Sequence, residues 1–170
     1  MCSGGNMSQI NMLINQPLLK MGRASDLCWI LFGERILGKD KKGNTIEKGE
    51  YSLHLQCPWR LRSKADSQIK LASGDIYEPN SKTTWSPDFN WDILGNNLFD
   101  EKVQHFFAGN KIISVKSVLI TQTNDLQIEF SNEFILECFV NMSTNTECWR
   151  FFRYNSDAHM VAYSNCAEFQ

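Results

Sequence analysis

The sequence predicts one mainly β domain of the α+β class. We expect an antiparallel meander of about eight or nine strands, folded as a sandwich or a strongly curved sheet, with one amphipathic helix over about 97–108. Three observations predict it. Short apolar segments separated by turn residues recur along the chain, only one segment has helical periodicity, and 170 residues that are 42% hydrophobic and 21% charged can bury one core. The predicted boundaries are a flexible N-terminus at 1–9, a globular domain at 10–163 and a C-terminal tail at 164–170.

The first third of the domain begins with a weak β pattern at 10–21, which Pro17 interrupts. A continuous apolar run follows at 27–32, and such a run is typical of a central strand buried on both faces. Segment 33–49 holds several glycines and Asn44, so it is predicted as a long hairpin connection.

The clearest strand pattern lies at 51–62, where apolar and polar residues alternate. The apolar set is Tyr51, Leu53, Leu55, Cys57, Trp59 and Leu61. Alternation with period two places one face on the core and the other toward water, so Trp59 should be buried. Pro58 lacks a backbone donor, which predicts that this strand lies at a sheet edge or contains a bulge.

A short strand at 68–72 precedes a long polar loop at 78–97, and a helix follows. Asn97 can cap that helix, and Asp100 and Glu101 fall in its first turn, where the helix dipole favours acidic residues. The apolar stripe that would pack on the sheet comprises Phe99, Val103, Phe106 and Phe107. The remaining strands are predicted at 111–120, 126–130, 134–140, 148–154 and 159–163.

Composition argues against several classes of protein. The net charge of −2 gives no electrostatic reason to expect nucleic acid, and the basic cluster 39–42 is interrupted by Asp40. The apolar runs are far shorter than a membrane span, and the N-terminus lacks the pattern of a secretion signal. We therefore expect a cytoplasmic protein that binds neither nucleic acid nor membrane.

Six cysteines are present, and three of them, Cys28, Cys57 and Cys138, lie in apolar strand patterns. A cytoplasmic chain keeps its thiols reduced, and free cysteine packs as a small apolar side chain. These three are predicted to be buried and unpaired.

No residue pattern predicts a metal site, a cofactor or a catalytic set. His54 and Cys57 are three apart in a strand and so face opposite sides of the sheet. The same alternation buries Cys57, which disfavours it as a nucleophile.

Acidic residues near the long loop leave an alternative open. Asp75 with Glu78, or Asp88 with Asp92, could form a carboxylate pair for acid–base chemistry. The neighbouring glycines and prolines favour the other interpretation, that these residues close turns.

Two arginines have candidate partners: Arg23 with Asp26, and Arg60 with Asp75, as ion pairs that hold the loop ends on the sheet. The alternative is that these arginines recognise an anionic group.

The long loop is the best candidate for a binding surface. Aromatic side chains supply large contact area at low entropic cost, and this polar loop carries three of them. The candidate binding residues are Asp75, Tyr77, Trp85, Phe89, Trp91 and Asp92. The alternative is that the aromatic residues fold back as a lid over the core.

Several segments resemble a family of small uncharacterised bacterial proteins, over about residues 15–163. They are GRASD at 22–26, FGE at 32–34, EYSLHLQCPWR at 50–60, GDIYEP at 74–79, FNWD at 89–92, NLFDEKV at 97–103 and ECWRFF at 147–152. The resemblance implies a binding protein without a cofactor, and some members resemble immunity proteins found beside secreted toxins. It assigns no catalytic residue.

These observations favour a non-enzymatic protein-binding module, with an immunity-type partnership to a bacterial toxin as its specific form. The alternative is a small-ligand-binding protein or a hydrolase that uses carboxylates near the 75–92 loop.

Overall fold

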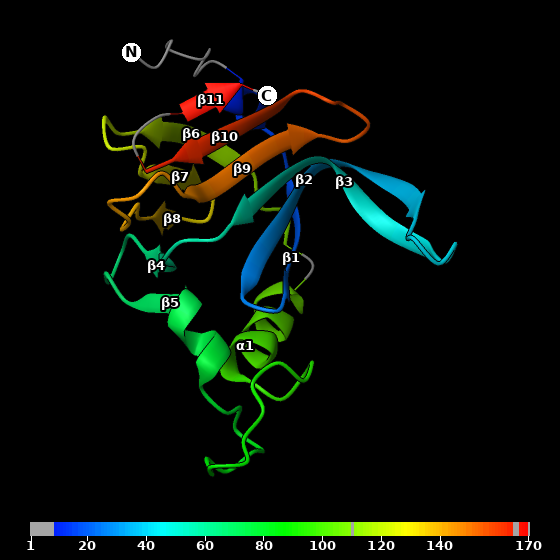
Figure 1. Cartoon of the computed structure of the whole chain (residues 1–170), viewed down its shortest axis with the longest axis vertical. Helices are drawn as coiled ribbons and strands as arrows, with labels where there is room; N and C mark the ends of the chain where they lie inside the picture. The colour runs from blue at the N-terminus through cyan, green and yellow to red at the C-terminus, as the bar shows by residue number, and fades with distance from the viewer. Residues whose placement is uncertain (1–8, 110, 165–166, 170) are drawn as a thin grey trace.

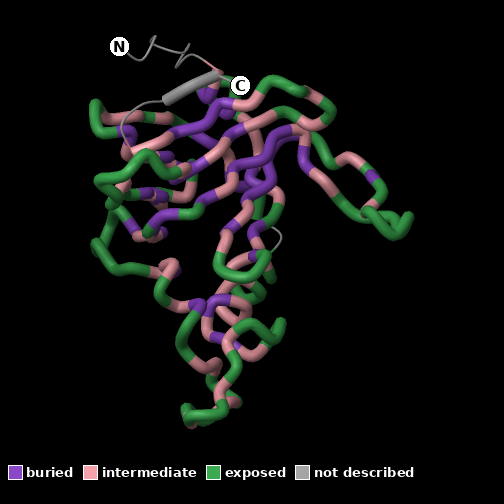
Figure 2. The backbone as a smooth tube through the Cα atoms, in the orientation of Figure 1, coloured by how far each residue is buried: buried purple, intermediate pink, exposed green. Residues whose placement is uncertain are grey.

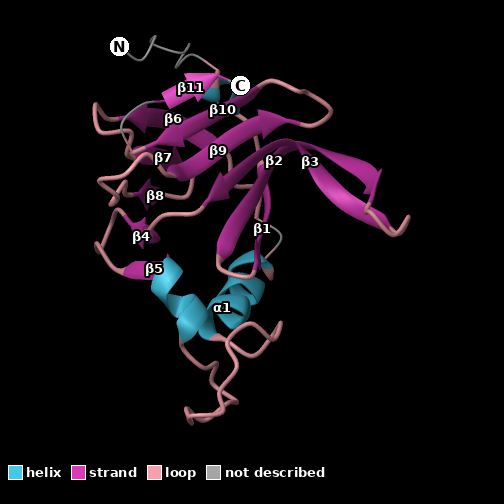
Figure 3. Cartoon of the chain, in the orientation of Figure 1, coloured by secondary structure: helices cyan, strands magenta, loops and turns pink. Residues whose placement is uncertain are grey.

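The computed structural model describes residues 9–109, 111–164 and 167–169. Its strands form two antiparallel sheets, one of six strands in the order β1-β2-β3-β9-β10-β11 and one of five in the order β5-β4-β8-β7-β6 (Figure 1). Helix α1 and the 3-10 helix η2 lie at one end of the sheets (Figure 3).

The six-stranded sheet contains β1 (Leu18–Ala24), β2 (Leu27–Lys39), β3 (Thr45–Leu55), β9 (Glu147–Arg153), β10 (His159–Tyr163) and β11 (Ala167–Phe169). The five-stranded sheet contains β4 (Trp59–Ser63), β5 (Ile69–Ala72), β6 (Val115–Ile120), β7 (Leu126–Phe130) and β8 (Phe134–Cys138). The helical elements are η1 (Ile10–Leu13), η2 (Ser73–Tyr77) and α1 (Leu98–Phe107).

One hydrophobic core joins the two sheets. Alternate residues of strands in both sheets contribute to it, as Leu53 and Trp149 do from one sheet and Leu61 and Ile128 from the other. Buried residues accordingly concentrate in the strands (Figure 2). The predicted mainly β α+β fold is confirmed, and the strands outnumber the eight or nine expected.

The long alternating segment is two strands rather than one. β3 ends at Leu55 and β4 begins at Trp59, and the two belong to different sheets. Pro58 therefore stands at a corner where the chain crosses between sheets, and the prediction of an edge strand or bulge was wrong. Both strands have neighbours on each side, and Pro58 interrupts neither ladder. Trp59 is buried, as predicted, with 2% of its surface exposed.

The predicted long connection at 33–49 is mostly strand, because β2 and β3 continue as a paired ribbon that projects from the body (Figure 1). Its base has an irregular register between Phe32 and Arg35, where Gly33 adopts a φ of +83°. At Gly49 a Cβ atom would lie 2.8 Å from the Phe32 carbonyl oxygen. Glycine is needed at position 49 because the β2 backbone at Phe32 lies too close to leave room for a Cβ atom.

Helix α1 begins as predicted. The Asn97 side-chain oxygen accepts a hydrogen bond of 2.9 Å from the Asp100 N–H, as an N-cap does. Phe99 is fully buried and meets the Trp59 ring edge-on at 5.8 Å. The helix therefore closes the core at the end where β4 begins.

The C-terminal end of the domain differs from the predicted boundary. The expected C-terminal tail contributes β11, which pairs with β10, so the domain extends beyond residue 163. Three residues give too short a pattern to predict a strand. The expected flexible N-terminus lies outside the described residues except for Gln9, which directly precedes η1.

Candidate protein-binding surface at the 78–97 loop

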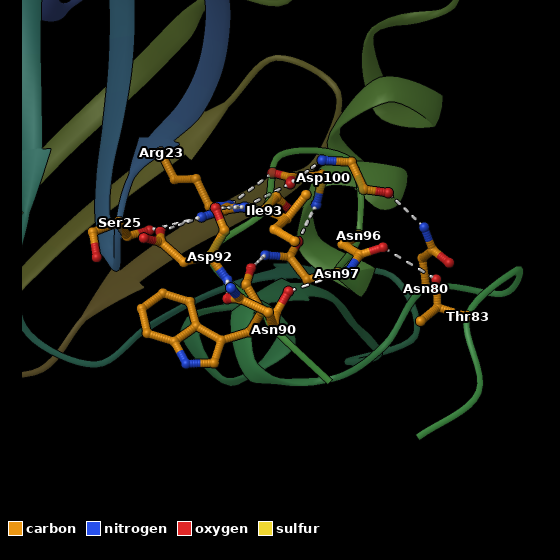
Figure 4. Close-up of polar contacts among 12 residues, drawn as sticks. Arg23, Ser25, Asn80, Thr83, Asn90, Asp92, Ile93, Asn96, Asn97 and Asp100 are labelled. Carbon is orange, nitrogen blue, oxygen red and sulfur yellow. Dashed lines mark hydrogen bonds and ion pairs between the residues drawn. The ribbon is translucent and has the colours of Figure 1, made fainter. Parts of the chain in front are cut away.

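A buried arginine at the end of β1 anchors the loop to the fold. The Arg23 side chain is 1% exposed, and its guanidinium donates to both Asp100 carboxylate oxygens at 3.0 and 2.9 Å (Figure 4). It also donates to the Asp92 carboxylate at 3.3 Å and to the carbonyl oxygens of Asp92 and Ile93 at 3.3 and 3.2 Å. One side chain therefore joins β1, the loop and the first turn of α1.

The predicted ion pairs were wrong in their partners. Arg23 pairs with Asp92 and Asp100 rather than Asp26, and Arg60 pairs with Glu137, its cross-strand neighbour on β8. Both pairs join residues distant in sequence: Arg60 and Glu137 are neighbours in the sheet, and Arg23 meets the loop and helix α1.

Side-chain amides hold the rest of the loop backbone. Asn97 donates to the Trp91 carbonyl oxygen at 3.0 Å, and Asn80 donates to the Gly95 carbonyl oxygen at 2.6 Å. The Gly95 N–H donates to the Asp100 carboxylate at 2.8 Å. Each end of the loop is thus bonded to the other, which gives a long connection a fixed shape without regular secondary structure.

The loop is also bonded to the exposed side of the helix. The Ser81 N–H and hydroxyl both donate to the Glu101 carboxylate at 2.7 Å. These hydrogen bonds lower the pKa of Glu101, because they favour its charged form.

Of the predicted aromatic residues, Trp85 and Trp91 occupy different environments. Trp91 is half-buried against the core and meets the Tyr77 ring edge-on at 5.0 Å. Trp85 is 65% exposed, and Phe89 is intermediate. Trp91 acts as the lid that the alternative interpretation described, while Trp85 faces solvent.

Tyr77 borders the same surface from η2. Its ring is 47% exposed, and its hydroxyl donates to the Asp26 carboxylate in the β1–β2 turn at 3.2 Å. Partial burial raises the pKa of Tyr77, and the negative charge of Asp26 adds to this effect.

Two exposed apolar residues of the loop were not among the predicted site residues. Ile93 is 55% exposed and Leu94 is 76% exposed. The two are adjacent in sequence and form an apolar pair in a polar loop. That pair is the sequence signal that could have identified them. We call these two, with Tyr77 and Trp85, the tip residues, which are exposed large apolar side chains of η2 and the loop. The loop itself projects beyond α1, away from the sheets (Figures 1 and 2).

Two of the four candidate carboxylates, those of Asp75 and Asp92, are engaged in structural contacts. Asp75 accepts from the Ala72 N–H at 2.9 Å and from the Lys102 ammonium at 3.1 Å, which fixes η2 against α1. Asp92 is bound to Arg23. Among the described residues, no group of three or more His, Cys, Asp or Glu side chains is arranged to hold a metal ion.

None of these carboxylates lines the cleft between β1 and α1. This cleft has a volume of about 870 Å³ and is formed by β1, the C-terminal half of α1, residues 111–112 and the base of the β2–β3 ribbon. Its apolar lining includes Leu19, Met21, Val103, Phe107 and Ile112. The predicted alternative, a ligand pocket beside the 75–92 loop, finds no support in this cleft.

The chain matches no family model, and no curated protein or solved structure is detectably similar to it. Within the described part of the chain, no helix has the length and apolar character needed to cross a membrane.

Proposed function

We propose that this protein is a non-enzymatic protein-binding module that contacts its partner through the tip residues. The observation that carries the proposal is the exposure of Trp85 and Leu94, at 65% and 76%, on a loop whose backbone is fixed by Arg23 and by side-chain amides. Large apolar side chains that are exposed to solvent at fixed positions are typical of interaction sites. A pre-ordered loop also loses little conformational entropy on binding.

The charge around the tip residues indicates the kind of surface that would match them. Loop residues 78–97 carry three acidic side chains, Glu78, Asp88 and Asp92, against the single basic Lys82, and within the described part of the chain only Asp92 among the three acidic side chains is paired, with Arg23. All four are exposed. The partner we propose has an apolar patch bordered by lysine or arginine.

The resemblance to small bacterial proteins implies a toxin as this partner, in the manner of an immunity protein. Growth of cells that produce a candidate toxin, with and without this protein, tests that form of the proposal. Equal toxicity in both cultures would contradict the toxin partnership while leaving protein binding by the tip residues open.

We expect Trp85→Ala and Leu94→Ala each to weaken partner binding at least about thirtyfold, the size of a hot-spot loss. The midpoint of thermal unfolding should change by no more than about 2 °C, because both side chains are largely exposed. The partner is first captured from native-host lysate with tagged protein and identified by mass spectrometry. Affinities are then measured with the purified partner by titration calorimetry.

Leu119→Ala is the matched control, because Leu119 on β6 is 56% exposed but lies outside the loop. It should bind as the wild type does. Unchanged affinity in both tip variants, or failure to capture any stoichiometric partner, would overturn the proposal.

A second candidate function, small-ligand binding, is supported by the 870 Å³ cleft. Its walls include Lys20 and Lys111, and neither ammonium group has a partner among the described residues. A third cation in the cleft, Arg35, is paired with Glu47 at 2.9 Å. An apolar cleft of this size with two unpaired cations suits an amphipathic organic anion, such as a medium-chain carboxylate.

We expect decanoate to bind at least about fivefold more tightly than decylamine, because one favourable charge contact is worth roughly 1 kcal/mol or more. Lys20→Glu and Lys111→Glu should each reverse this preference, and Lys82→Glu on the distant loop should not. Titration calorimetry below the micellar range measures all three variants. Equal binding of the two amphiphiles by the wild type would exclude the anion site.

A further inference from the structure

Two cysteine thiols meet at the corner where the chain crosses between the sheets. Cys57 lies between β3 and β4, and Cys138 is the last residue of β8. Their sulfur atoms are 3.1 Å apart, although the residues are 81 positions apart in sequence. The pairing of Trp59 with Cys138 in the β4–β8 ladder holds them together.

The environment of these thiols differs from that of an isolated buried cysteine. Cys57 is 7% exposed and Cys138 is fully buried. The hydrogen bond from Cys138 lowers the pKa of Cys57, and the same bond raises the pKa of Cys138, which keeps its proton. Cys28 is also fully buried, makes no hydrogen bond to another sulfur among the described residues, and its pKa is raised by burial alone.

We propose that Cys57 and Cys138 form an intramolecular disulfide bond when the protein meets hydrogen peroxide. A disulfide requires a sulfur separation of about 2.05 Å, so the two atoms need to approach by roughly 1 Å. The free thiols predicted from the sequence are the reduced form of this pair. The formation of this disulfide does not depend on the proposed function.

The oxidation balances in two steps. The Cys57 thiolate attacks one peroxide oxygen, the O–O bond breaks, and Cys57 becomes a sulfenic acid while the leaving hydroxide takes up a proton to form water. The Cys138 sulfur then attacks the Cys57 sulfur, the S–O bond breaks, and the Cys138 proton leaves with the hydroxide as a second water. Two thiols and one peroxide thus give one disulfide and two waters.

The bond would join the corner that links the sheets to the end of β8. Because it would close a loop of more than eighty residues, it should restrict the unfolded chain and raise the unfolding midpoint by about 5–10 °C. Oxidation would therefore stabilise the connection between sheets without altering the exposed loop.

The test treats native, full-length protein with a small molar excess of hydrogen peroxide, followed by alkylation of free thiols under denaturing conditions. Peptide mapping by mass spectrometry should find the Cys57–Cys138 disulfide as the major crosslink, and unfolding should shift upward by the stated amount. Cys138→Ala should abolish both changes, and Cys28→Ala, a matched buried control, should retain them.

Mapping of the wild type needs no variant, so the result stands even if Cys138→Ala fails to fold. Major crosslinks to any other cysteine, Cys148 included, would overturn the proposal. So would recovery of Cys57 and Cys138 as alkylated thiols or as separate sulfinic acids.

Discussion

Trp59→Ala is expected to lower the free energy of unfolding by about 3–5 kcal/mol, the range for deleting a buried large aromatic side chain. Trp59 is 2% exposed and lies at the first position of β4, where it contacts Phe99 of α1. Its removal opens a cavity between the five-stranded sheet and the helix. Urea unfolding monitored by far-ultraviolet circular dichroism measures the loss.

Trp85→Ala serves as the comparison, because it deletes the same side chain from an exposed position. Its cost should stay below about 1 kcal/mol. If Trp59→Ala also cost less than this, the assignment of Trp59 to the core between β4 and α1 would be wrong.

Arg23→Ala is expected to cost about 3–5 kcal/mol, as removal of one partner from a buried ion pair does. The Asp100 carboxylate is 15% exposed and would lose its cation, and the carbonyl oxygens of Asp92 and Ile93 would lose a donor. Backbone amides of 90–98 should exchange hydrogen faster in this variant, because the loop loses its anchor. Hydrogen exchange with mass spectrometry detects this local effect separately from the global loss.

Arg35→Ala provides the control, since the Arg35–Glu47 pair is largely exposed and such pairs contribute about 0–1 kcal/mol. Equal losses in the two arginine variants, or unchanged exchange of 90–98 in Arg23→Ala, would argue against the anchoring role of Arg23.

The sequence predicted the structural elements that depend on patterns among residues close together in the chain. Alternation over 51–61 identified the buried face that holds Leu53 and Trp59, and the cap at Asn97 identified the start of α1. The crossing at Pro58 was missed because inward-facing residues alternate in the same way on both sides of the corner. Alternation reports the buried face of a strand but carries no information about its sheet.

The candidate site was likewise predicted only in part. The sequence predicted an aromatic loop, but it could not distinguish the exposed Trp85 from the packed Trp91, because both follow polar turn residues. The anchor was also missed. Arg23 and Asp100 lie 77 positions apart, and only the packing of α1 beside β1 brings them together.

The order of strands in the six-stranded sheet has a consequence for synthesis on the ribosome. β3 lies between β2 and β9, and β9 is made long after β3 has left the exit tunnel. During that interval the nascent chain presents the outer edge of β3 with nothing from its own sequence to pair with it. An unpaired apolar edge invites association with other chains. Yield in vivo should therefore depend on how fast translation proceeds from β4 to β9 and on the chaperones that hold the growing chain.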